Sequence, residues 1–141
     1  MSSLVTSLGT GTKYVRPWNR IPPHILPKGV PSPLHYALIN VKNAWLVSDG
    51  YTLVAVYAGS PGGEASIGRF AIIRQNLIFG IQYERPDFVD VRNAGALRIT
   101  GAPRGAASET TAQHGQLVFG SARGTRGVLE LAGDHVRITR R

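Results

Sequence analysis

The chain has 141 residues, no cysteine and a formal net charge of +8. This length suits one domain that buries a sizeable hydrophobic core. The lack of cysteine excludes a disulfide framework and a thiolate metal site. No apolar run approaches the ~20 residues of a membrane-spanning helix. The first nine residues lack the basic and apolar regions of a secretory signal peptide. We therefore expect a protein without a membrane span, in the cytoplasm or in a virion or other particle assembled inside the cell.

The charge is distributed unevenly along the chain. Residues 1–48 contain five bases and no acid, residues 49–91 contain three bases and five acids, and residues 92–141 contain eight arginines and three acids. Basic ends favour anionic partners, such as nucleic acid, an acidic protein surface or the acidic middle of a second copy. An arginine-rich proteome would give the same charge without any partner, so the charge alone does not choose between these interpretations.

Residues 1–33 are predicted to form an extended N-terminal arm. Six of the nine prolines lie between Pro17 and Pro33, and each removes a backbone donor and disfavours helix and central strand. The arm also carries large apolar side chains that a solvated tail would lack: Tyr14, Val15, Trp18, Ile21, Ile25 and Leu26. We expect the arm to dock on its own domain or on a neighbour, and residues 34–141 to form a single β-domain.

The predicted elements after the arm are short strands. Residues 32–42 fit either an alternating strand or, as we favour, one or two helical turns capped by Ser32 and followed by a strand. Two strands, Ala44–Ser48 and Tyr51–Ala58, flank Asp49-Gly50, which predicts a hairpin with a type I′ turn. Further predicted strands cover Ile67–Arg74, Leu77–Tyr83, Phe88–Val91, Ala96–Thr100, Gln116–Gly120, Val128–Leu131 and Val136–Thr139.

Two features of these strands indicate how they pack. The two predicted strands on either side of Gln75-Asn76, which we expect to form a second hairpin, are almost continuously apolar. This pattern predicts that both faces of these strands are buried. The later strands alternate apolar and polar residues, as antiparallel sheets over one core do. The predicted fold is therefore all-β: an antiparallel β-sandwich or small barrel of about eight or nine short strands, with at most one short helix.

Motifs for metal or phosphate chemistry are missing. The four histidines, His24, His35, His114 and His135, have no metal-ligand spacing. The Gly9–Lys13 stretch lacks the spacing and the flanking elements of a phosphate loop, and no serine lies in a nucleophile elbow. We expect no catalytic residue, no metal and no cofactor, and hence a protein that is not an enzyme.

Three neighbouring carboxylates, Glu84, Asp87 and Asp90, form the remaining acidic cluster. They lack the spacing of a calcium loop. Salt bridges are the better interpretation, with Arg85 and Arg92 as the partners near them in sequence.

Two groups of residues are candidates for binding a partner. The turn Arg123–Gly127 places two arginines on a glycine-rich loop, and the guanidinium fork suits phosphate or carboxylate. The arm combines arginine with aromatic side chains, which suits base stacking or a protein interface. The candidates are Tyr14, Arg16, Trp18, Arg20, Ile21, Arg123, Arg126, Arg137, Arg140 and Arg141.

These observations favour a non-enzymatic structural or assembly protein, such as a virion component. Its β-domain would dock through the arm on copies of itself or on other subunits, and we expect the domain to fold without residues 2–31 while assembly fails. The alternative is a basic accessory module that holds nucleic-acid phosphates through its arginines. A small barrel enzyme or ligand carrier would need polar groups converging in a pocket, for which the sequence has no signal.

Overall fold

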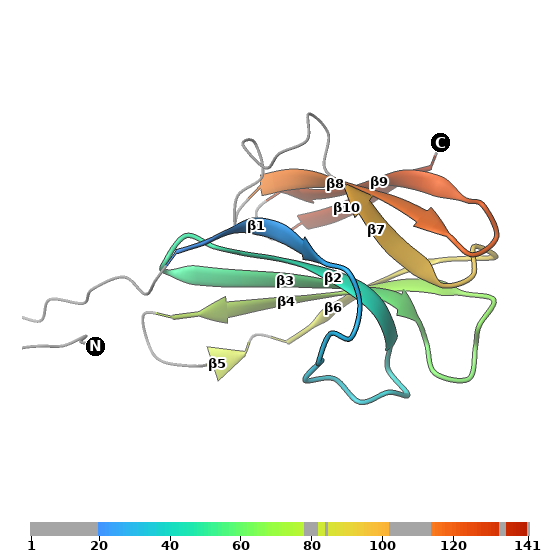
Figure 1. Cartoon of the computed structure of the whole chain (residues 1–141), viewed down its shortest axis with the longest axis horizontal. Helices are drawn as coiled ribbons and strands as arrows, with labels where there is room; N and C mark the ends of the chain where they lie inside the picture. The colour runs from blue at the N-terminus through green and yellow to red at the C-terminus, as the bar shows by residue number, and fades with distance from the viewer. Residues whose placement is uncertain (1–19, 78–81, 84, 102–113, 133–134, 141) are drawn as a thin grey trace, which may run out of the picture.

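A computed structural model describes residues 20–77, 82–83, 85–101, 114–132 and 135–140. The fold is all-β, with two antiparallel sheets and no helix in these ranges (Figure 1). The larger sheet has the order β1-β2-β3-β4-β5, and β6 also pairs with β4. Its strands are β1 (Ile21–Leu26), β2 (Asn40–Ser48), β3 (Thr52–Ser60), β4 (Gly68–Asn76), β5 (Gln82–Tyr83) and β6 (Asp87–Val91).

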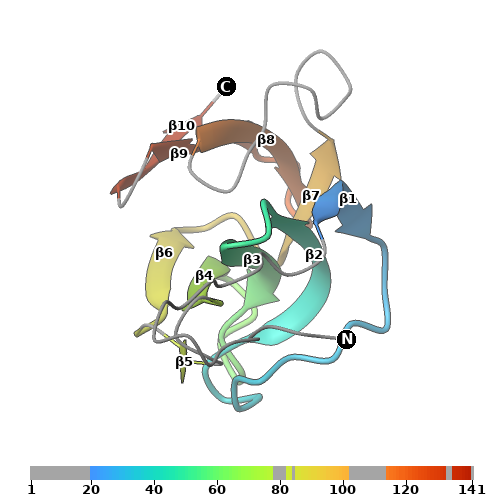
Figure 2. The same cartoon turned by 90° about the vertical axis from the view of Figure 1, so that its left-hand side faces the viewer.

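The smaller sheet contains the four later strands in the order β10-β9-β8-β7. These are β7 (Leu97–Gly101), β8 (His114–Ser121), β9 (Arg126–Ala132) and β10 (His135–Arg140). Each predicted strand from Phe88 onward lies within one of β6 to β10 or overlaps it. The all-β prediction is confirmed, and the two layers seen in Figure 2 fit a sandwich.

The hydrophobic core lies between the two sheets. Trp45 of β2, Phe70 of β4 and Phe119 of β8 are among its largest fully buried side chains. The rings of Phe70 and Phe119 meet edge to face, with centroids 5.2 Å apart, an arrangement that adds to the energy of burial. The alternation on β7 to β10 places Leu97, Leu117 and Leu129 inward, as the sequence pattern predicts.

The first hairpin forms where it was predicted, but its turn differs. Ser48 pairs with Leu53, so four residues connect the paired positions. Gly50 has a φ of 97°, whereas Asp49 is not among the residues with positive φ. A type I′ turn needs a positive φ at both of these residues. Instead, Oδ1 of Asp49 accepts hydrogen bonds from the backbone N–H groups of Tyr51 and Thr52, each at 2.9 Å.

The prediction of a turn at Gln75-Asn76 is wrong. Both residues belong to β4 and pair with Tyr83 and Gln82 of β5. Of the strand predicted over Leu77–Tyr83, only β5 lies in the described residues, and residues 78–81 lie outside them. The apolar run of β4 ends at Ile73, and the polar residues Arg74, Gln75 and Asn76 still belong to the strand. The change in polarity therefore does not mark where that strand stops.

The segment before β2 forms a single tight turn rather than a helix. The backbone N–H groups of Leu38 and Ile39 donate to the carbonyl of His35, at 2.9 and 3.3 Å. The side chain of Ser32 accepts a hydrogen bond from the N–H of Leu34 at 3.0 Å. The strand β2 follows directly from Asn40.

Part of the predicted arm belongs to the sheet. Residues Ile21–Leu26 form β1, an edge strand that pairs antiparallel with β2, and Ile25 packs against the core. The register shifts between Ile21 and His24, where Pro22 and Pro23 lack the N–H groups that a regular ladder needs. Because of this strand, we no longer expect residues 2–31 to be dispensable for folding. Residues 1–19 lie outside the described residues.

Candidate interaction surfaces

The larger sheet is apolar on both faces. Its inner face covers the core, and its outer face carries Leu46 on β2, Ala55 on β3, and Ala71 and Ile73 on β4. Three of these are almost inaccessible, with exposed fractions of 6% for Ala55, 0% for Ala71 and 5% for Ile73. An antiparallel sheet that faces water normally shows polar residues there. The near-continuous apolar pattern of β4 is the sequence signal for this second buried face.

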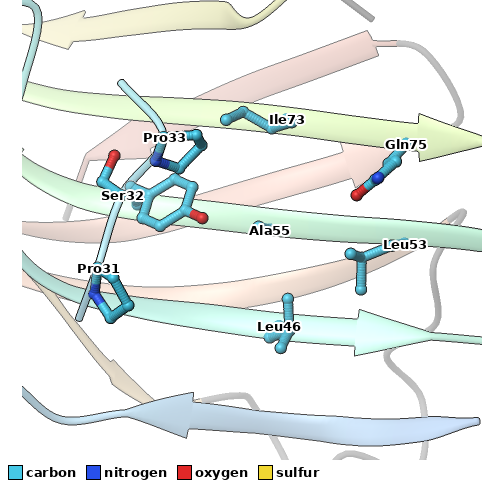
Figure 3. A pocket seen from close by; sticks show the side chains of 9 residues that line it. Pro31, Ser32, Pro33, Leu46, Leu53, Ala55, Ile73 and Gln75 are labelled. Carbon is cyan, nitrogen blue, oxygen red and sulfur yellow. The ribbon is translucent and has the colours of Figure 1, made fainter. Parts of the chain in front are cut away.

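A groove of about 380 Å³ runs over this outer face, and we call it the outer groove (Figure 3). Its floor comes from three adjacent strands and its wall from a connecting segment that crosses them. The lining residues are Pro31, Ser32, Pro33, Leu46, Leu53, Ala55, Tyr57, Ile73 and Gln75. This set is mainly aliphatic and aromatic, so the groove suits the burial of apolar side chains.

The wall of the outer groove is held by local geometry. Pro31 and Pro33 have fixed φ angles, and Ser32 between them caps Leu34. The turn that follows packs against the β3–β4 loop, where the N–H of Gly62 donates to the carbonyl of Ala37 at 3.2 Å. A Cβ at Gly62 would lie only 2.6 Å from the carbonyl oxygen of Tyr36. Glycine therefore permits the close approach that holds this wall in place.

One buried polar group of the groove has no partner among the described residues. The exposed fraction of Gln75 is 7%, and its side-chain amide forms no hydrogen bond with any described residue. Buried amides are normally paired, because leaving one unpaired costs about 1–3 kcal/mol. The groove therefore offers one donor group and one acceptor group to an occupant.

The acidic cluster is used in salt bridges across the strands. Arg69 of β4 forms a bidentate salt bridge with Asp90 of β6. Its Nε lies 2.7 Å from Oδ1 and its Nη2 lies 2.9 Å from Oδ2. Arg74 pairs with Asp87 at 2.7 Å. The salt-bridge interpretation is confirmed for these two carboxylates, but the partners predicted from sequence proximity are wrong. Glu84 lies outside the described residues.

Arg69 also links the sheet edge to the turn before β2. Its Nη1 donates to the carbonyl of Leu38 at 2.9 Å, and its guanidinium lies 5.2 Å from the ring centroid of Phe88. The hydrogen bond to Asp90 raises the pKa of Arg69 further above its ordinary range. These contacts give Arg69 a structural role at the edge of the outer face.

Among the described arginines of the predicted basic set, Arg20 lies far from Arg123 and Arg126. Arg20 is exposed just before β1, which begins opposite Ser48 at the end of β2. Arg123 and Arg126 are exposed at the turn between β8 and β9. Figure 1 shows the start of β1 and this turn at opposite ends of the sandwich.

Two further arginines of the set are engaged within the protein. Arg137 of β10 forms an ion pair with Glu130 of β9, and its Nε lies 3.0 Å from Oε1. This hydrogen bond, with a weaker one from Gln116, lowers the pKa of Glu130. Arg140 donates to the carbonyl of Arg92 at 2.6 Å. The other predicted residues, Tyr14, Arg16, Trp18 and Arg141, lie outside the described residues.

A second hollow is basic, and sequence reasoning missed it. It measures about 340 Å³, and its lining includes Lys42 of β2 and Arg98 of β7. Arg98 donates one hydrogen bond to the carbonyl of Pro27 at 3.0 Å. The two bases are separated by 56 positions, so only the contact between the sheets brings them to one hollow.

Two of the histidines, His24 and His35, have local partners. Nδ1 of His24 lies 2.8 Å from the carbonyl of Pro22, to which it donates. Nδ1 of His35 accepts from the N–H of Ala37 at 3.0 Å. In the described ranges, no three residues of the metal-binding types gather into a site that could hold an ion.

Comparisons with known proteins give no assignment. No family model, curated protein or solved structure matches the chain. Within the described residues, no helix is long and apolar enough to cross a membrane. The surfaces described above are therefore the basis for inferring a function.

Proposed function

We propose that this protein is a non-enzymatic assembly component whose β-sandwich docks on neighbouring copies through its N-terminal arm. The observation that carries the proposal is the apolar outer face of the larger sheet with its groove. A two-sheet sandwich needs only one apolar face on each sheet for its own core. Much of the second apolar face on β2, β3 and β4 is already buried within the chain, but Leu46, Leu53 and Tyr57 stay partly exposed in the groove, and apolar residues in such a groove are the kind of surface that a partner covers.

The arm carries side chains that suit this surface. Tyr14, Val15 and Trp18 precede β1 within a few residues, and tyrosine and tryptophan are the residues that most often anchor protein interfaces in pockets. Pro17 restricts the free chain, so less entropy is lost when the segment becomes ordered. A virion or another particle built from repeated copies is a setting that this arrangement suits.

The test is the solution mass of the full chain, measured by light scattering over a range of concentrations. We expect an assembly for the wild type and a monomer for the double variant Tyr14→Ala/Trp18→Ala. The matched control is Tyr51→Ala, which removes a tyrosine that is 42% exposed on the β2–β3 hairpin and should leave the mass unchanged. A wild type that stays monomeric at every concentration would contradict the proposal.

The alternative function is a nucleic-acid-binding module, and the hollow with Lys42 and Arg98 favours it. The internal contacts of Arg137 and Arg140 weigh against it, because these groups are already used. Phosphate contacts make binding fall steeply with salt. If this function is correct, Lys42→Gln/Arg98→Gln should lower the log–log salt slope by roughly two. If the assembly function is correct, any retention on DNA should be weak and unaffected by this change.

A further inference from the structure

We propose that the outer groove is the receptor for residues 14–18 of the arm of a second copy. This inference rests on the proposed function and adds where the arm binds. Three observations carry it: the position at which the arm leaves the sheet, the buried unpartnered amide of Gln75, and the size and lining of the groove.

The arm leaves the sheet beside one end of the groove. Ile21 pairs with Ser48, Ser48 with Leu53, and Leu53 with Gln75. These four residues form one row across β1, β2, β3 and β4. Neighbouring strands lie about 4.8 Å apart, so the floor residue Leu53 is roughly 10 Å from Ile21.

The length of the arm matches this distance. Trp18 precedes Ile21 by three residues, a span of at most ~10 Å in extended chain. The aromatic residues of the arm therefore come within reach of the groove end formed by Leu53 and Gln75. When a segment can reach its own body so closely, exchange between copies replaces each contact with an identical one and costs little. An assembly built by this exchange leaves no arm unbound and no groove empty.

The amide of Gln75 indicates the chemistry of the occupant. Gln75 is only 7% exposed and lines the groove, and its amide has no partner among the described residues. An extended segment that contains proline makes no internal backbone hydrogen bonds, so its N–H and C=O groups are free to pair with an amide. The indole N–H of Trp18 also needs an acceptor when it is buried.

The dimensions of the outer groove fit a few side chains. Its volume of about 380 Å³ lies near the lower end of the roughly 300–1,000 Å³ typical of ligand pockets. The floor of Leu46, Leu53, Ala55 and Ile73 is aliphatic (Figure 3). It suits aromatic rings held by a short extended segment rather than a folded element.

The test is site-specific photo-crosslinking in the full chain. Trp18 is replaced by p-benzoylphenylalanine, the protein is irradiated at assembly concentration, and the attachment points are mapped by mass spectrometry. We expect a crosslinked dimer in which the attachment lies on Leu46, Leu53 or Ile73. Attachment to the groove within a single chain would overturn the assignment to a second copy. Attachment elsewhere, or none, would overturn the assignment to the groove.

Two variants of the groove separate this inference from the proposed function. Leu53→Glu places a charge on the floor, and Ala55→Phe fills the groove from the floor without adding charge. Both should shift the mass by light scattering to that of the monomer. The control Val118→Glu changes a partly buried position on β8 outside the groove and should keep the assembly. If Tyr14→Ala/Trp18→Ala dissociates the assembly but folded Leu53→Glu and Ala55→Phe do not, the groove assignment fails and the function stands. If none of these variants changes the mass, both fail.

Discussion

The side-chain amide of Asn43 holds the backbone of Ile99 at both of its polar groups. Nδ2 of Asn43 donates to the carbonyl of Ile99 at 2.8 Å, and the N–H of Ile99 donates to Oδ1 at 2.9 Å. Asn43 lies on β2 of the larger sheet and is 2% exposed, and Ile99 lies on β7 of the smaller sheet. One side chain thus joins the two layers and closes part of an otherwise free strand edge.

We predict that Asn43→Ala lowers the free energy of unfolding by roughly 2–5 kcal/mol, because the N–H and C=O groups of Ile99 both lose the buried hydrogen bond that Asn43 provides. Urea denaturation followed by tryptophan fluorescence measures the change. The control is Thr139→Ala on an exposed position of β10, which should change stability by less than about 0.5 kcal/mol. Equal changes in the free energy of unfolding for the two substitutions would show that the hydrogen bonds of Asn43 contribute no more to stability than an exposed side chain.

A second prediction concerns the boundary of the arm. Deleting residues 2–19 should leave the unfolding free energy of the sandwich nearly unchanged, whereas deleting residues 2–31 removes β1 and the core contact of Ile25. The longer deletion should cost at least ~2 kcal/mol, the value of burying one large aliphatic side chain. Thermal unfolding by circular dichroism compares the two. Equal stability of both truncated proteins would place β1 outside the folding unit.

The third prediction uses two glycines of the smaller sheet. A Cβ at Gly127 would lie 2.5 Å from the carbonyl oxygen of Thr139 and 2.7 Å from the ring of Phe119, whereas the nearest atom to a Cβ at Gly120 is 3.8 Å away. Gly127→Ala should therefore destabilise the protein by about 1–3 kcal/mol through overpacking. Gly120→Ala should be neutral or slightly stabilising. The reverse order in urea denaturation would contradict the packing described for Phe119.

The fourth prediction is a pH dependence at Glu130. The hydrogen bond from Arg137 lowers the pKa of Glu130 in the folded state. The stabilisation is therefore complete above the pKa of the unfolded chain and is lost as the pH falls through the folded pKa. The stability difference between wild type and Glu130→Gln should shrink over that acidic range. An NMR titration in which Arg137→Gln leaves the pKa of Glu130 unchanged would contradict this cause.

Local patterns predicted much of the fold. Asp49-Gly50 marks a hairpin because glycine there adopts a positive φ, and the alternation around Leu117 and Leu129 identifies the core face of the smaller sheet. The edge strand β1 was missed because prolines disfavour strands, although an edge tolerates them where the register shifts. The prediction of a turn at Gln75-Asn76 was wrong because the polar residues Arg74, Gln75 and Asn76 resemble a turn, whereas they continue β4 and pair with β5.

The interaction surfaces were less predictable, because they depend on pairing over long sequence distances. Arg69 meets Asp90 through strand register, and the contact between the sheets brings Lys42 and Arg98 to the same hollow. The unpartnered amide of Gln75 appears only when the outer groove is assembled from three strands. The arginines near the two chain ends were grouped by composition, but the sandwich separates Arg20 from Arg123.

The central claim is that aromatic residues of the arm join copies of this protein. Light scattering on the full chain and on Tyr14→Ala/Trp18→Ala, at the same series of concentrations, tests it most directly. The account predicts a mass of several copies for the wild type and of one copy for the folded variant. Identical masses for the two proteins would contradict it.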